Sequence, residues 1–175
     1  MWAAEVADFL LPAEFDLWGI LPRTASGLVG VPLSPFLHGD FTHLLANTVP
    51  FVLLGMLVAW RAGPQTLWIL AVVILVGGLG VWLLAPANVV TIGASGVVFG
   101  LLGYLLTAGV ITRRLIDILL AIGLLLLYGG TLMGITPFGV SAGVSWLAHL
   151  TGFGAGVLSA LWFAPRRARP QSVAA

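Results

Sequence analysis

The sequence predicts an all-α, polytopic membrane helix bundle that folds as a single domain over residues 1–175. Of the 175 residues, 60% are hydrophobic and 7% are charged, whereas about 25% of the residues of a soluble domain are charged. Two ranges, 62–112 and 118–165, contain no Asp, Glu, Lys or Arg. Each range is about twice as long as one helical span, which needs about 20 apolar residues. These observations favour a multi-pass membrane protein over a soluble one.

The placement of arginine orients the two ranges in the membrane. Arg61 precedes the first range, Arg113–Arg114 lies between the two, and Arg166 follows the second. Cytoplasmic segments are enriched in arginine, so each range is expected to leave the cytoplasm and return to it. Turn-forming residues stand near the middle of each range, at 86–88 and at 136–139.

Two crossings in each range predict four helices, and a fifth helix precedes Arg61. The expected helices cover 42–60, 65–85, 95–112, 115–135 and 146–164, which make five clear transmembrane spans within 42–165. Asp117 follows Arg113 by one helical turn, which predicts a local ion pair. The tail at 166–175 is expected to be cytoplasmic and disordered.

The first forty residues differ from the rest. Glu5, Asp8, Glu14 and Asp16 make this start too polar and too short for an ordinary span. Residues 1–12 are interpreted either as an interfacial helix or as the remnant of a shortened first span. Residues 13–41 are expected to form an outer loop. Whether Met1 is the native start stays open at this point.

Composition also excludes several functions. The chain has no lysine and no basic cluster with interleaved aromatic residues, so nucleic acid is not an expected partner. It has no cysteine, which excludes a thiol nucleophile and a cysteine metal site. His38, His43 and His149 could in principle bind zinc. However, His38 and His43 do not have the spacing of two ligands on one helical face, and no carboxylate partner is evident. No metal or other cofactor is therefore expected.

Three chemically active residues share one depth in the predicted bundle. Ser95 precedes Arg113, His43 precedes Arg61 and His149 precedes Arg166 by nearly equal apolar intervals. Each interval spans roughly 26 Å as a helix. If the arginines mark one membrane face, the serine and the two histidines lie together near the other face. The pattern predicts a reaction site inside the bilayer, assembled from three helices.

Ser95 lies where a loop becomes a helix. A serine is a weak nucleophile without a base within hydrogen-bond reach, and histidine is the usual base. Gly93 and Gly96 allow other backbone to approach closely. The free amides and positive dipole at a helix start suit a developing oxyanion. A serine between glycines in a membrane helix is more often a packing residue, so this segment alone does not establish a nucleophile.

His149 begins the last predicted helix beside a face of small residues. Gly152 and Gly156 form a small-xxx-small face, and three glycines of the serine helix can pack against it. The serine-helix glycines are Gly96, Gly100 and Gly103. Such close packing would bring Ser95 within reach of His149. A lone membrane histidine near an interface can also be structural.

His43 and Asn47 are four residues apart and so share one face of the 42–60 helix. Both side chains can donate hydrogen bonds to an oxyanion. The same pair could instead form a hydrogen-bonded clasp between helices. Asp40 is the only acid near this site, and its place just before the helix favours an N-terminal cap over a catalytic role.

The order and spacing of these residues resemble a known family. His38-x4-His43-x3-Asn47, then Gly93-x-Ser95-Gly96, then Ala148-His149-x2-Gly152-x3-Gly156 resemble the bacterial type of the rhomboid family of intramembrane serine proteases. The resemblance implies a rhomboid-like six-helix core, here with the first helix shortened or incomplete.

The resemblance also implies roles for the site residues. Ser95 would be the nucleophile and His149 the general base and then acid. His43, Asn47 and the Ser95 amide would form the oxyanion hole, with His38 supporting it. The 115–135 helix and the loop at 137–145 would form a gate and a cap. The family often has tyrosine four residues after the nucleophile, where this chain has Phe99, which keeps the ring that stacks on the base.

The resemblance further implies a location and partners. The protein would lie in the plasma or inner membrane, with its site toward the outer face and its C-terminus in the cytoplasm. Its partners would be the lipid bilayer and single-pass or other membrane proteins, cut near the outer leaflet at a small residue.

Two other functions compete with the protease. An inactive rhomboid-like protein would bind membrane clients without cleavage, but such proteins commonly lose one of the catalytic pair, and Ser95 and His149 are both present. A small channel would need polar residues along whole spans, yet 53–59 and 101–106 are apolar.

Overall fold

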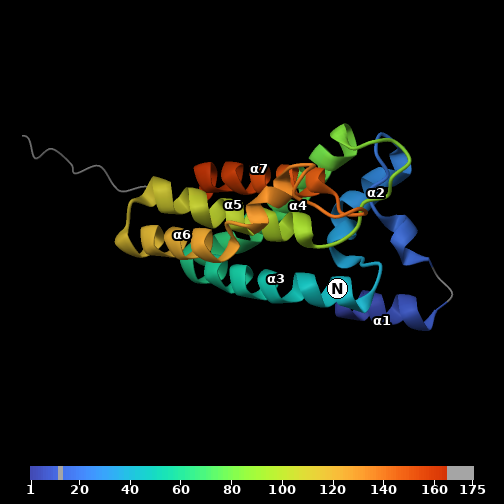
Figure 1. Ribbon diagram of the computed structural model, residues 1–175, viewed down its shortest axis with the longest axis horizontal. Helices are drawn as coiled ribbons and strands as arrows, with labels where there is room; N and C mark the ends of the chain where they lie inside the picture. Colours follow the sequence, from blue (N-terminus) through green and yellow to red (C-terminus); the bar gives the residue numbers. More distant parts are fainter. Residues whose placement is uncertain (12–13, 165–175) are drawn as a thin grey trace, which may run out of the picture.

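The computed structural model describes residues 1–11 and 14–164, and nearly all of this part is helical (Figure 1). The α-helices are α1 (Trp2–Leu10), α2 (Ala25–Leu33), α3 (Phe41–Ala62), α4 (Thr66–Leu84), α5 (Ser95–Thr112), α6 (Leu115–Tyr128) and α7 (Trp146–Phe163). Short 3-10 turns are η1 (Phe15–Trp18), η2 (Ser34–Phe36), η3 (Gly63–Gln65) and η4 (Thr131–Ile135). The described residues contain no β-strand beyond one isolated bridge between Ile20 and Thr91. The predicted all-α helix bundle is confirmed.

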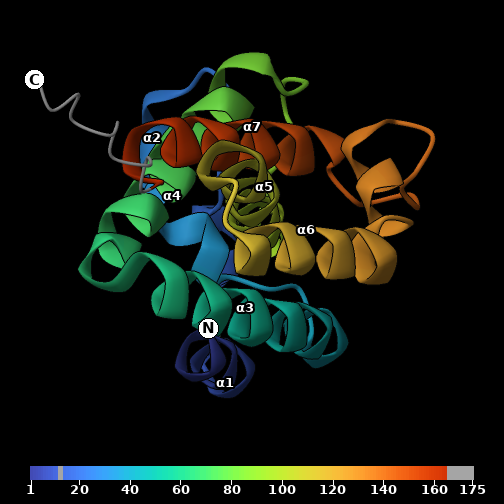
Figure 2. The same ribbon diagram turned by 90° about the vertical axis from the view of Figure 1, so that its left-hand side faces the viewer.

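Helix α5 is the central element of the bundle. Viewed along the bundle, α7, α4, α3 and α6 surround it (Figure 2). Leu101 is fully buried and Tyr104 nearly so, because these four helices cover most of α5. The starts of α3, α5 and α7 lie at the same end of the bundle as α2 (Figure 1). The three predicted site segments therefore meet at one end.

Glycine allows α5 and α7 to approach closely. A Cβ atom added at Gly152 would collide with the carbonyl oxygen of Gly96, and one added at Gly156 would collide with that of Gly100. A Cβ atom at Gly77 of α4 would lie 3.2 Å from the Cα atom of Gly152. Helices in a membrane associate largely through such packing, since lipid gives no hydrophobic drive between them.

Three segments of the described chain are long and apolar enough to cross a membrane. They are Phe41–Leu84, which contains both α3 and α4, Ser95–Thr112 and Trp146–Phe163. The outward side chains of the bundle are apolar too, as with Val110 and Leu126, which are 74% and 84% exposed. Large exposed apolar surface is what a helix bundle presents to lipid.

The helix boundaries follow the sequence analysis except in two places. The helix expected at 115–135 ends at Tyr128, and η4 follows after Gly129 and Gly130. Glycine is a poor helix former, and two in succession weaken the last turns. The range expected as an outer loop at 13–41 contains α2, which was not predicted. The tail at 166–175 lies outside the described residues.

The ion pair of Asp117 is not the local one that the spacing suggested. Its carboxylate pairs with Arg61 of α3, fifty-six residues away in the sequence. The prediction used only the helical spacing from Arg113, whereas the fold brings the Arg61 side chain of α3 to the start of α6.

Candidate active site

Ser95 and His149 lie in direct contact. Ser95 is the first residue of α5 and His149 lies in the first turn of α7. Their Oγ and Nε2 atoms are 2.9 Å apart. The glycine contacts between α5 and α7 begin next to both residues, at Gly96 and Gly152. The close packing of the two helices therefore brings the two side chains together.

The His149 ring is held in two further ways. Its Nδ1 atom lies 3.0 Å from the carbonyl oxygen of Gly134. The Phe99 ring stacks on it, with ring centroids 4.2 Å apart and planes 10° apart. A carbonyl oxygen can only accept a hydrogen bond, so this contact places the ring proton on Nδ1. The Nε2 atom is then free to accept the proton of Ser95.

Gly134 was not among the residues that the sequence indicated. It belongs to η4, which follows α6, and it acts through its backbone carbonyl. A backbone acceptor has no residue type to reveal it in a sequence.

The segment just before Ser95 is hydrogen-bonded to the segment around α2. Ile20 and Thr91 exchange backbone hydrogen bonds of 2.9 and 3.0 Å, and the Gly93 amide donates to the Ser34 carbonyl at 2.9 Å. The Ala94 amide lies 3.4 Å from Nε2 of His38. These contacts fix the backbone that leads into α5 and hence the direction of the Ser95 side chain.

His38 is a buried, neutral support in this arrangement. It is 1% exposed, and burial together with repulsion from His43 lowers its pKa to about 4. Its ring is therefore uncharged near neutral pH and can accept the hydrogen bond from Ala94.

His43 lies between His38 and the turn before the serine. Its ring meets that of His38 edge to face, with centroids 5.1 Å apart. A Cβ atom added at Gly93 would lie 2.8 Å from Cε1 of His43. Gly93 also has a φ of +106°, a conformation that favours glycine. Both the space and the backbone therefore require glycine at this position.

Asn47 and Asp40 are engaged with the backbone of α3. The buried Asn47 amide donates to the His43 carbonyl at 3.0 Å, so it is bonded within its own helix. Asp40 caps α3, since its carboxylate accepts from the His43 amide at 2.8 Å. The capping role predicted for Asp40 is confirmed.

A cavity opens beside this group of residues. It measures about 690 Å³ and lies between the loop after α4 and the segment that leads into α7. Its lining includes Gly39, His43, Val89, Ile92, Ser145 and Trp146. This space is large enough for several side chains of a peptide. Within residues 1–11 and 14–164, no group of three or more His, Asp or Glu side chains could hold a metal ion.

Comparison with known proteins identifies relatives that cover most of the chain or a part of it. A family model described as the Rhomboid domain matches residues 26–166. An uncharacterized protein of Mycobacterium tuberculosis (strain ATCC 25618 / H37Rv) is 39% identical over 174 residues, which cover 95% of this chain and 72% of that protein. An uncharacterized protein of Mycobacterium leprae (strain TN) is 38% identical over 178 residues, covering 95% and 69%. Rhomboid-like protein 11, chloroplastic, of Arabidopsis thaliana is 40% identical over 67 residues, covering 38% and 24%.

Proposed function

The chain belongs to the rhomboid family, and on that premise we propose that it is an intramembrane serine endopeptidase that cuts transmembrane segments of other membrane proteins. The observation that carries the proposal is the 2.9 Å contact between Ser95 Oγ and His149 Nε2. A partly buried serine beside an oriented histidine is the arrangement that makes the hydroxyl nucleophilic.

The first half of the reaction forms an acyl-enzyme. The Ser95 oxygen attacks the carbonyl carbon of the scissile peptide while its proton passes to Nε2 of His149. The resulting imidazolium keeps its Nδ1 proton bonded to the Gly134 carbonyl, 3.0 Å away. When the tetrahedral intermediate collapses, the C–N bond breaks and Nε2 returns the proton to the leaving amine.

The second half of the reaction hydrolyses the ester. His149 accepts a proton from a water molecule, which attacks the acyl carbon. The Ser95 oxygen then leaves and regains its proton from His149. The Phe99 ring, stacked at 4.2 Å, holds the imidazole in one orientation through both halves.

The oxyanion of each intermediate would be bound at the start of α5. The Ser95 amide lies at the positive end of that helix dipole, and the His43 ring lies against Gly93 just before it. Asn47 would join them when its amide turns from the His43 carbonyl toward the substrate. A single oxyanion donor contributes about 3 kcal/mol to catalysis.

The proposed orientation follows from the arginines. Arg61, Arg113 and Arg114 lie at the end of the bundle opposite Ser95, which the positive-inside rule assigns to the cytoplasm. In a plasma or inner membrane the site would then face the outer leaflet. Water and the unwound part of a substrate would enter from that side.

Cleavage in liposomes tests the proposal. The purified protein is reconstituted with a reporter that contains one transmembrane segment, and the products are followed by mass spectrometry. The parent is expected to cut the reporter, and Ser95→Ala and His149→Ala are expected to lose cleavage by at least 1,000-fold, because the pair acts as a unit.

Ser159→Ala is the matched control. Ser159 is a fully buried serine on α7, and its hydroxyl donates to the Ala155 carbonyl of its own helix at 2.9 Å. This variant is expected to cut at the parental rate. A folded parent that retains the reporter without cutting it would refute the proposal and favour a client-binding role.

A further inference from the structure

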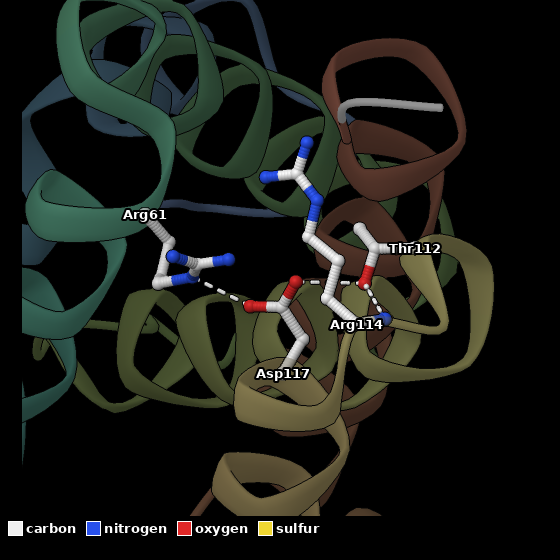
Figure 3. A network of polar contacts seen from close by, with 4 residues as sticks. All are labelled: Arg61, Thr112, Arg114 and Asp117. Atoms are coloured by element: carbon white, nitrogen blue, oxygen red, sulfur yellow. Dashed lines mark hydrogen bonds and ion pairs between the residues drawn. The ribbon is translucent and has the colours of Figure 1, made fainter. Parts of the chain in front are cut away.

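A polar network joins three helices at the end of the bundle far from Ser95 (Figure 3). Nε of Arg61, on α3, lies 2.5 Å from Oδ1 of Asp117, on α6. The Thr112 hydroxyl, at the end of α5, donates to Oδ2 of the same carboxylate at 2.7 Å. The Thr112 hydroxyl also accepts from the Arg114 amide at 3.4 Å. Both carboxylate oxygens therefore have partners, each on a different helix.

The ion pair of this network is largely shielded from solvent. The side chains of Arg61 and Asp117 are 18% and 6% exposed. Removing one partner of a buried ion pair strongly destabilises the arrangement around the charge that is left. The start of α6 is also fixed by shape, because a Cβ atom added at Gly109 would lie 2.8 Å from the Asp117 carbonyl oxygen. The first turn of α6 thus has one well-defined place.

The other end of α6 is not packed against α3. A cavity of about 400 Å³ lies there, lined by Ala46, Val49 and Pro50 of α3, by Val98, Phe99 and Leu102 of α5, and by Tyr128 and Thr131 at and after the end of α6. Phe99 is the residue that stacks on His149. The chain after α6 continues to Gly134, whose carbonyl contacts His149. The free end of α6 thus adjoins the Ser95–His149 pair.

We infer that Asp117 is a positioning residue, and that its network with Arg61 and Thr112 is the pivot that sets the tilt of α6 and the width of the cavity beside the site. Helix α6 has 14 residues, which span about 21 Å. A tilt of about 10° around its first turn moves its far end by about 3.5 Å. This distance is large compared with the hydrogen bonds at the site. The inference deepens the proposed function, because it identifies what controls access to the same pair.

Distance measurements test the pivot without any assay of cleavage. The chain has no cysteine, so introduced cysteines are the only sites for spin labels. Leu45 on α3 and Leu126 on α6 are 56% and 84% exposed, and labels there report the separation of the two helices. In Asp117→Asn the mean label distance is expected to increase by about 3 Å and to spread. A label pair at Leu45 and Leu158, on α7, is expected to keep its distance.

Arg114→Gln is the matched control for charge. It removes a cation from the same end of the bundle. Arg114 forms its hydrogen bond to the network through its backbone amide, and its guanidinium acts on Asp117 only through its charge, without an ion pair. Figure 3 shows its guanidinium directed away from the Asp117 carboxylate. The label distances in Arg114→Gln are expected to match those of the parent. An unchanged Leu45–Leu126 distance in folded Asp117→Asn would overturn the inference.

Thr112→Val keeps the inference testable if Asp117→Asn does not fold. It retains the ion pair and removes one of the two bonds to the carboxylate, so a smaller increase in the same distance is expected. A folded Thr112→Val with parental distances would also contradict the pivot.

Kinetics connect the pivot with access. If α6 holds the binding-competent tilt about one third of the time in Asp117→Asn, the apparent KM for the transmembrane reporter rises about threefold. The rate at which a small fluorophosphonate labels Ser95 is expected to stay within twofold of the parent. A defect that disturbed the Ser95–His149 pair itself would lower the cleavage rate and the labelling rate together. Failure of the parent to cut would refute the proposed function, while the label distances would still decide the pivot.

Discussion

The glycine contact between α5 and α7 gives the sharpest prediction about how the site is built. A Cβ atom at Gly152 would overlap the carbonyl oxygen of Gly96, and real Cβ atoms essentially never approach within 3.0 Å of such an atom. Both partners are helix backbone, which cannot rotate away as a side chain can. In Gly152→Ala the two helices must therefore separate, by about 1 Å on the geometry of the overlap.

The consequence for the reacting atoms follows directly. The Ser95–His149 distance of 2.9 Å lengthens beyond the hydrogen-bond limit of about 3.5 Å. A misplacement of about 1 Å in a reacting pair lowers the rate about 100-fold. Overpacking of this kind also lowers the free energy of unfolding by about 1–3 kcal/mol.

Gly154→Ala is the matched control on the same helix. A Cβ atom at Gly154 meets nothing within 4 Å, so this substitution is expected to preserve both rate and stability. The assay is the second-order rate of fluorophosphonate labelling at Ser95, with thermal unfolding in parallel. A Gly152→Ala protein that is labelled within threefold of the parental rate would refute the reasoning.

Two further predictions concern the supports of the pair. Phe99→Leu removes the stacked ring, and because an aromatic pair contributes about 1 kcal/mol, kcat/KM for the reporter is expected to fall about fivefold. Phe99→Tyr keeps the ring and is expected to retain the parental kcat/KM. Equal kcat/KM values for Phe99→Leu and the parent would exclude the orienting role of the ring. His38 has its pKa lowered to about 4 in the folded protein, against about 6.5 in the unfolded chain. As the pH falls, the unfolded chain therefore binds the proton at a higher pH than the folded protein does. The contribution of His38 to the free energy of unfolding is fully present above pH 6.5, and the free energy of unfolding falls by up to about 3 kcal/mol as the pH drops toward 4. Thermal unfolding of the parent and of His38→Gln between pH 7 and pH 4 checks this, and an equal pH dependence in both would contradict it.

Much of the bundle could be predicted because charge is so scarce. Arg61 and Arg113 end their helices at or near the observed limits, and the turn residues between them divide the apolar ranges. Helix α2 was missed because Pro22, Pro32 and Pro35 suggest a loop. Yet Thr24 caps this helix, its side chain accepting from the Gly27 amide at 3.0 Å. Pro32 lies inside it.

The contacts that could not be predicted are those made through backbone or across distant segments. The carbonyl of Gly134 and the bonds of Ile20 with Thr91 depend on where loops fold back, which residue types do not encode. The Arg61–Asp117 pair joins helices that are far apart in the sequence. Helical spacing gave Asp117 a local partner because it contains no information on tertiary packing.

The central claim is that Ser95 is an activated nucleophile and His149 its base. Mass spectrometry of the protein after treatment with a fluorophosphonate tests this claim most directly. The account predicts one adduct, on Ser95, in the parent and in Ser159→Ala, and no adduct at the same dose in His149→Ala. An adduct on another serine, or none on the folded parent, would contradict it.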